Sequence, residues 1–118
     1  MESYHRHQRV ESLIQEELNK IILREIEFPA GVLVTITEVA IQKDLDFATI
    51  NFSVIPIQQS NQVLEMLSKA QRRLKHLLYE KIHIKPMPEL RFKIDYGLEN
   101  AAELEKTFIN LEKQEENK

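Results

Sequence analysis

Hydrophobic and polar residues follow two different periods along this chain. Apolar side chains recur at three- and four-residue steps through 6–27, and this spacing predicts an amphipathic helix. A period of two runs through 31–41 and 47–55 and predicts two β-strands. Ser60 or Asn61 is then expected to cap a second helix, which continues until the stretch HIKPMP breaks it.

The stretch KPMPELRFKIDYG, residues 85–97, alternates again and predicts a third strand. Leucine, phenylalanine and isoleucine alternate there with Arg91 and Lys93, so one face of the strand is apolar and the other is cationic. The alternation of the first strand slips at Glu38, which takes an apolar phase. A β-bulge near 37–39 would restore the phase; the alternative is a strand end that is covered on both sides.

The predicted elements follow the order α-β-β-α-β-α. A short polar link at 42–46 makes the first two strands an antiparallel hairpin. After Gly97, the spacing of Leu104, Phe108 and Leu111 predicts a short final helix. We expect one domain over 1–111, followed by a flexible acidic tail at 112–118 that contains no apolar side chain.

Composition narrows the class of protein. No apolar run approaches about 18 residues, so no transmembrane helix is expected. The first residues contain no apolar region of the kind that a signal peptide needs, and the chain has no cysteine, which fits a reducing cytoplasm. We therefore expect a cytoplasmic protein that does not bind membranes.

Charge is distributed unevenly, although the net charge is only −3. Residues 68–93 carry 8 basic and 2 acidic side chains, which gives +6. Residues 1–67 carry 5 basic and 10 acidic ones, and residues 94–118 carry 3 basic and 7 acidic ones. A compact basic segment thus lies between two acidic ones, so the net charge of the chain does not exclude a nucleic-acid partner.

The basic segment supplies a candidate RNA-binding surface. At 100° per residue, Lys69, Arg72, Arg73 and His76 share one face of the second predicted helix, opposite its leucines. Such a stripe suits phosphate binding, although lysine and arginine on solvated helix faces are common. The complete set of candidate RNA-binding residues is Arg6, Arg9, Lys69, Arg72, Arg73, Lys75, His76, Lys85, Arg91 and Lys93.

Catalysis has little support in the sequence. The four histidines, His5, His7, His76 and His83, show no metal-ligand spacing with a carboxylate. With only Gly31 and Gly97, there is no glycine-rich phosphate loop. We expect no enzyme activity, no metal, no cofactor and no small-molecule substrate.

Several separated motifs resemble the bacterial ribosome-binding factor A family. PELRFKID is similar to that family's Pro-Glu-Leu-x-Phe-x-x-Asp signature, and VTITEVAIQKDLDFATINFSV resembles its hairpin. RVESLIQEELNKIILREIEFP resembles its first helix. The resemblance extends over about residues 6–111, and the motifs agree in order and spacing.

The resemblance implies an α+β fold of the type II KH-like class, in which the helices lie on one face of a three-stranded sheet in the order α-β-β-α-kink-α-β. The family has an Ala-x-Gly kink between two helices; Ala70 matches the alanine, and Arg72 occupies the glycine position. The implied partners are the small (30S) ribosomal subunit and its 16S rRNA. The implied role is late 30S maturation and rRNA processing, with particular importance in the cold, by a factor that we expect to be a monomer.

On this interpretation, Arg91 and Lys93 of the third strand and the helical stripe belong to one RNA-binding surface. The alternative is a protein-interaction module with a KH-like fold and no RNA binding. The third class is a small-molecule or enzyme domain, and no feature of the sequence supports it. Salt dependence distinguishes the RNA-binding factor from the protein-interaction module, because phosphate binding weakens steeply with salt and apolar docking does not.

Overall fold

A computed structural model describes residues 2–42 and 46–97 of the chain, with side chains from Gln8 onward. Its elements are α1 (Glu2–Glu25), β1 (Leu33–Ile41), β2 (Phe47–Ile55), a 3₁₀ turn (Ile57–Gln59), α2 (Ser60–Lys69), α3 (Gln71–Ile82) and β3 (Glu89–Ile94). This order confirms the prediction as far as β3. The predicted final helix and the acidic tail at 112–118 lie outside the described residues.

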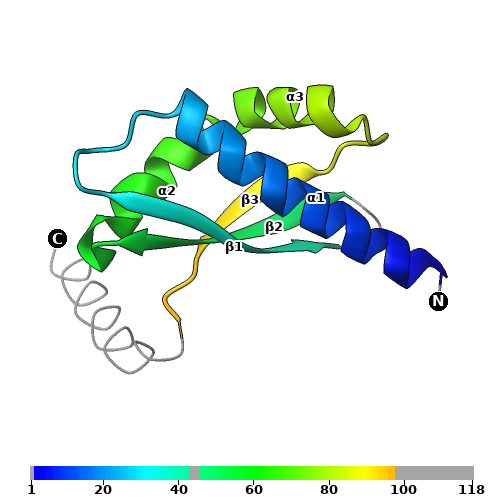
Figure 1. Ribbon diagram of the computed structural model, residues 1–118, viewed down its shortest axis with the longest axis horizontal. Helices are drawn as coiled ribbons and strands as arrows, with labels where there is room; N and C mark the ends of the chain where they lie inside the picture. Colours follow the sequence, from blue (N-terminus) through cyan, green and yellow to red (C-terminus); the bar gives the residue numbers. More distant parts are fainter. Residues whose placement is uncertain (1, 43–45, 98–118) are drawn as a thin grey trace, which may run out of the picture.

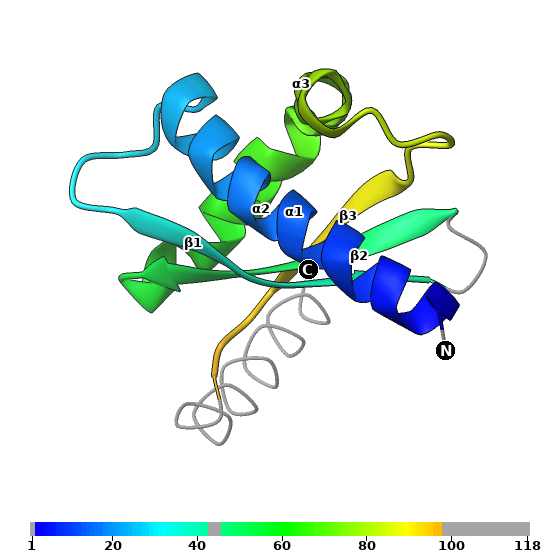
Figure 2. The same cartoon turned by 45° about the vertical axis from the view of Figure 1, so that its right-hand side comes forward.

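The three strands form one sheet in the order β1-β2-β3, with β1 antiparallel and β3 parallel to β2 (Figure 1). Because β2 and β3 run in the same direction, the chain between them must cross back along the sheet, and α2 and α3 make this crossing. All three helices lie on one side of the sheet, as expected (Figure 2). The opposite side, called the open face below, carries no described helix.

The slip in the first strand is a β-bulge. Ile36 is paired with Phe52 and Glu38 with the preceding residue, Asn51, so Thr37 is the extra residue. The bulge returns Val39 to the helix side, where it is buried in the core. The predicted bulge is therefore confirmed, and the alternative of a strand end covered on both sides is wrong.

The core lies between the helices and the sheet. The apolar residues at alternate positions of β2 are all buried, and Phe52 is fully buried with its ring 6.4 Å from that of Phe92 in an edge-on contact. From the helices, α1 contributes four buried residues, Ile14, Leu18, Ile21 and Ile22. The predicted apolar face of the first helix is thus the face that covers the sheet, although the helix starts earlier and ends two residues earlier than predicted.

Side-chain amides of α1 cover part of the free edge of β1. The Asn19 Oδ1 accepts a hydrogen bond from the Ile36 backbone N–H at 2.8 Å, and its Nδ2 donates to the Ile36 carbonyl at 3.2 Å. The Gln15 Nε2 donates to the Thr37 carbonyl at 3.2 Å. These bonds satisfy backbone groups at the bulge that no strand pairs with, which ties α1 to the sheet and protects its edge.

The predicted cap of the second helix is wrong. Ser60 is the first residue of α2 and is buried, and its hydroxyl donates to the Ile57 carbonyl at 2.6 Å instead of accepting a bond from a helix amide. The residue before it, Gln59, makes no side-chain cap bond either. The serine hydroxyl therefore closes the preceding 3₁₀ turn. It can do so because a serine hydroxyl can either donate to a nearby backbone carbonyl or accept from a nearby backbone amide.

Candidate nucleic-acid interface

The second predicted helix is broken at Ala70, which separates α2 from α3. Ala70 has φ −87° and ψ 0°, in the bridge region between helix and strand. Its amide donates to the Met66 carbonyl at 3.1 Å, and its carbonyl accepts from the Leu74 amide at 2.9 Å. Ala70 thus closes the last turn of one helix and opens the first turn of the next.

The kink forms although Arg72 stands where the family pattern has glycine. Among the described non-glycine residues, only His83 has a positive φ, so neither Ala70 nor Arg72 adopts a conformation that favours glycine. Arg72 is an exposed residue in the first turn of α3. Its guanidinium therefore lies at the N-terminal end of that helix, where the backbone amides and the helix dipole also favour an anion.

Most side chains of the predicted stripe have a carboxylate partner. Lys69 Nζ lies 3.1 Å from Glu65 Oε1, and His76 Nε2 lies 3.0 Å from Glu80 Oε1. Arg72 differs, because no ion pair to it occurs within residues 8–42 and 46–97. A bound phosphate would have to displace a paired carboxylate at Lys69, whereas the described carboxylates lie beyond ion-pair distance of Arg72.

Arg73, the next residue of the stripe, points toward α1. Its guanidinium pairs with the carboxylate of Glu25, the last residue of α1. The side chain of Glu25 is only 20% exposed, so the pair lies at the junction of the two helices. Arg73 is therefore best explained as a contact that joins α3 to α1.

Glu89, the first residue of β3, joins that strand to the start of α3. Its carboxylate accepts from Lys75 Nζ at 2.6 Å and from Gln71 Nε2 at 3.1 Å, and both donors lie on one face of α3, four residues apart. The hydrogen bond from Lys75 lowers the pKa of the Glu89 carboxyl below its ordinary value. The charges of Lys75 and Arg72 act in the same direction, and desolvation opposes them.

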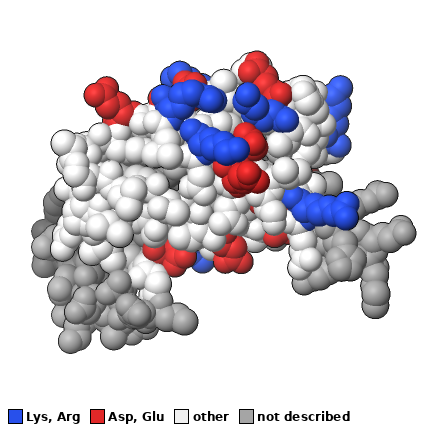
Figure 3. Space-filling view, in the orientation of Figure 1, with Lys and Arg blue, Asp and Glu red and all other residues white. Residues whose placement is uncertain are grey.

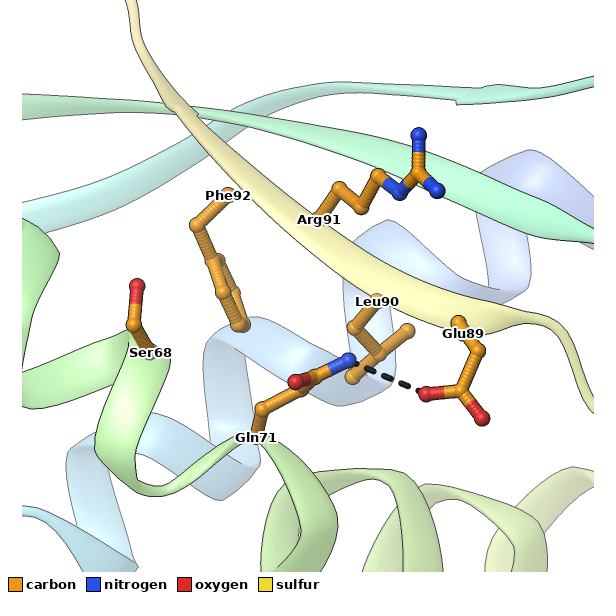
Figure 4. Close-up of a pocket in the computed structure, with 6 residues that line it drawn as sticks. All are labelled: Ser68, Gln71, Glu89, Leu90, Arg91 and Phe92. Atoms are coloured by element: carbon orange, nitrogen blue, oxygen red, sulfur yellow. Dashed lines mark hydrogen bonds between the residues drawn. The ribbon is translucent and has the colours of Figure 1, made fainter.

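A concavity opens beside the kink, between α2, α3 and the free edge of β3 (Figure 4). It measures about 440 Å³ and is lined by Ser68, Gln71, Glu89, Leu90, Arg91 and Phe92. The Glu89 and Asp95 amides donate toward β2, so by alternation the amides of Leu90 and Phe92 face the free edge. The concavity therefore offers backbone and side-chain hydrogen-bonding groups beside the cations of α3.

The two strand cations lie on the open face, away from the helical stripe. Arg91 is adjacent to Thr49 of β2, and its guanidinium carbon lies 3.7 Å above the centre of the Phe47 ring. Figure 4 shows this side chain extending to the side of β3 that is remote from Gln71. Lys93 is adjacent to Asn51 on the same face. The helical stripe and the strand cations therefore do not share one face of the molecule.

The remaining candidates are also dispersed. Sixteen residues of α1 separate Arg9 from Glu25, which is about 24 Å along the helix axis. Arg9 therefore lies far from Arg73 and the kink. Lys85 is exposed in the loop between α3 and β3, and the side chain of Arg6 lies outside the described part.

Positive and negative side chains lie side by side on the face that Figure 3 shows. Figure 3 shows Lys and Arg directly beside Asp and Glu over α1 and α3, whereas the surface over β1 and α2 is largely uncharged. Among the described residues, no group of three or more His, Cys, Asp or Glu side chains could hold a metal ion. None of the described helices is long and apolar enough to cross a membrane.

These positions define the kink surface, which consists of Lys69, Gln71, Arg72, Lys75, His76 and Glu89 together with the concavity beside them. The sequence identified the cations of this surface but missed Gln71 and Glu89. The helical spacing of polar residues in α3 could have identified Gln71, because it lies four residues before Lys75 on the same face. Nothing local indicated that the first residue of β3 would reach the same face.

Comparisons with known proteins agree with this architecture. The family model described as Ribosome-binding factor A matches residues 6–108. A ribosome-binding factor A from Lactobacillus acidophilus is 34% identical over 113 residues, which cover 94% of this chain and 93% of the relative.

Solved structures share the fold. The crystal structure of ribosome-binding factor A from Thermus thermophilus matches with a TM-score of 0.67 and 22% identity, over 75% of this chain and 94% of the other. A homology model of the Thermus thermophilus factor, fitted into the cryo-EM map of a 30S–ribosome binding factor A complex, matches with a TM-score of 0.62 and 24% identity, over 70% and 88% of the two chains. The fold is therefore the KH-like fold expected from the sequence, and the chain belongs to the ribosome-binding factor A family.

Proposed function

We propose that this protein binds the small ribosomal subunit during its assembly and contacts the 16S rRNA through the kink surface. Family membership supports the choice of partner, since a member of this family has been fitted into a map of its complex with the 30S subunit. The proposed role is to assist late maturation and rRNA processing, particularly in the cold. Such a role requires binding and no catalytic step.

The observation that carries the proposal is the environment of Arg72. This residue combines an exposed guanidinium with the first turn of a helix, and the first turn of α3 contains no acidic residue. Guanidinium groups bind phosphate through two parallel hydrogen bonds, and helix N-termini favour anions. A phosphate of the rRNA backbone therefore fits this position better than the positions of Lys69 and Lys75, which are paired with carboxylates.

The surrounding cations are held in place by acidic neighbours. Lys75 is bonded to Glu89 and Lys69 to Glu65, so a phosphate must displace or share each carboxylate. This competition lowers the free energy gained from each phosphate contact. It therefore weakens binding to RNA whose shape does not match the surface. We infer that Arg72 contributes most to affinity and that its neighbours contribute mainly to selection among RNA shapes.

The concavity beside the kink suits an extended RNA strand. It extends from the kink to the free edge of β3, where Leu90 and Phe92 offer backbone groups. Bases that leave a helix can bond to such groups while their phosphates stay near α3. The proposed target is thus an unpaired rRNA segment of the immature subunit.

The proposed mechanism is a shift in RNA conformation by differential affinity. A protein that binds one rRNA arrangement more tightly than another stabilises it by the difference in binding free energy and by no more. Release then follows when the completed subunit no longer offers the preferred arrangement. This mechanism predicts tighter binding to immature than to mature small subunits.

Co-sedimentation across a salt series tests the proposal. The protein should pellet with immature small subunits more than with mature ones, and log K should fall with log salt by about 0.7 to 0.9 per phosphate contact. Full ribosomes serve as the control for general attraction to rRNA. Binding that is independent of salt would favour the protein-interaction alternative, and no pelleting at low salt would contradict the proposal.

A further inference from the structure

Exposed apolar side chains gather at one end of the open face. Leu33 of β1 and Ile55 of β2 are directly opposite each other in the sheet and are 55% and 63% exposed. Residues opposite each other on antiparallel strands lie close enough for their side chains to touch. Ile57, which is 36% exposed, follows two residues later. Leu33 and Ile55 form an apolar patch at the end of the hairpin remote from the 42–46 link, and no described element covers it.

The chain leaves the described structure at the same end. The Asp95 amide donates to the Phe52 carbonyl at 2.7 Å, and β3 runs parallel to β2. Ile55 comes three residues after Phe52 and Gly97 two residues after Asp95, so both lie toward the same end of the sheet. Gly97 has φ +72°, and its amide donates to Asp95 Oδ1 at 3.0 Å, so the chain turns at this point.

The sequence that follows has the pattern of a helix that could cover the patch. In LENAAELEKTFINL, residues 98–111, the apolar side chains of Ala101, Leu104, Phe108 and Leu111 recur at steps of three and four. This segment lies outside the described residues, so its sequence alone indicates the helix. Such a helix would be about 21 Å long, which fits along a nine-residue strand of about 30 Å.

Charge favours the same placement. On the open face, the carboxylates of Glu38 and Asp95 bond to Asn51 and to Thr37, at 3.4 and 2.7 Å. Lys93 has no carboxylate within ion-pair distance among the described residues.

The segment, in contrast, carries acidic side chains near its start. They are Glu99, Glu103 and Glu105, against the single basic residue Lys106. A docked segment would therefore be able to supply a carboxylate to Lys93.

We propose that residues 98–111 dock as an amphipathic helix on the open face, with Leu104 and Phe108 against Leu33 and Ile55. This inference is independent of the proposed function. It also assigns Lys93 to an intramolecular ion pair instead of an RNA contact. The open face would then be closed to RNA, which leaves the kink surface as the nucleic-acid interface.

The absence of cysteine from the chain allows a direct test by disulfide cross-linking. The test variant carries Ile55→Cys with Leu104→Cys in the full-length protein. The matched control carries Leu23→Cys with Leu104→Cys, because Leu23 of α1 is similarly exposed, at 69%, but lies in the helical layer on the other side of the sheet. Mild oxidation is followed by non-reducing electrophoresis and peptide mapping.

The proposal predicts an intramolecular disulfide in the test variant that forms at least about tenfold faster than in the control, since docking raises the effective concentration of the two thiols. Equal rates would overturn it. A disulfide that forms only between molecules would also overturn it and would identify a second copy of the chain as the occupant.

A second measurement avoids cysteine altogether. Leu33→Ser and Phe108→Ser should each lower Tm, and the double variant should lower it little further than the larger single effect, because both remove one contact. Fully additive decreases in Tm would contradict docking at this patch.

Discussion

At the scale of single residues, the surface of this protein is governed by carboxylates that hold cations in place. Glu89 provides the clearest example, because it accepts hydrogen bonds from both Lys75 and Gln71 at the edge of the concavity. A count of charges along the sequence treats Lys75 as a free cation. The structure shows that its side chain is only 29% exposed and is committed to Glu89.

The Glu89 carboxyl should titrate below its ordinary pKa of 4.5. Lys75→Met removes the hydrogen bond and the nearest positive charge, so the pKa of Glu89 should rise toward the ordinary value. Carboxyl-detected NMR titration measures the change. Lys81→Met, which alters a lysine at the far end of α3, is the control and should leave that pKa unchanged.

The same shift has a consequence for stability. Folding lowers the pKa of Glu89, so the carboxylate stabilises the folded state above about pH 4.5 and this contribution is lost as pH falls through the lowered value. Lys75→Met should flatten the pH dependence of unfolding in that acidic window. An unchanged pKa in the variant would show that Lys75 and Glu89 do not interact in solution.

At the scale of elements, hydrophobic periodicity predicted most of what the structure contains. Alternation identified the inward faces of all three strands, and the slip at Glu38 located the bulge. Periodicity did not locate the kink, because the apolar phase continues through Ala70 from one helix to the next. Only the resemblance to a family indicated the break.

Contacts between elements were not predictable from local patterns. Asn19 lies on the polar part of a helix, where an amide is usually solvated, but here it bonds to both backbone groups of Ile36. Arg73 falls on the predicted cationic stripe, but its partner is Glu25, 48 residues away. Periodicity reports which way a side chain points and not which distant element lies there.

The amide of Asn19 should be important for stability. Asn19→Leu leaves the Ile36 N–H without a partner and the Ile36 carbonyl with only the longer bond from Gln15 Nε2, at 3.4 Å, so the free energy of unfolding should fall by about 1–3 kcal/mol. Urea denaturation of the variant measures this loss. Asn61→Leu makes the same chemical change at an exposed position of α2 and should alter stability little. Equal effects in the two variants would show that the bonds to Ile36 contribute nothing specific.

At the scale of the whole molecule, the acidic and basic segments of the sequence do not become separate faces. Within the described residues, carboxylates from α1, α2, α3 and β3 pair with four side chains of the basic segment, Lys69, Arg73, Lys75 and His76. On the helical stripe, Arg72 is the residue without a described carboxylate partner, and it lies next to a concavity and a helix end. RNA binding is therefore attributed to a local site and not to the total charge.

The most direct test of this claim compares two charge reversals in the binding of immature small subunits. Arg72→Glu should weaken binding by at least about tenfold, or roughly 1.4 kcal/mol, and should reduce the salt slope by about one phosphate contact. Lys81→Glu makes the same change in net charge nine residues later, on the opposite side of α3, and should have little effect. Equal weakening by both variants, or no weakening by Arg72→Glu, would contradict the kink surface as the RNA-binding site.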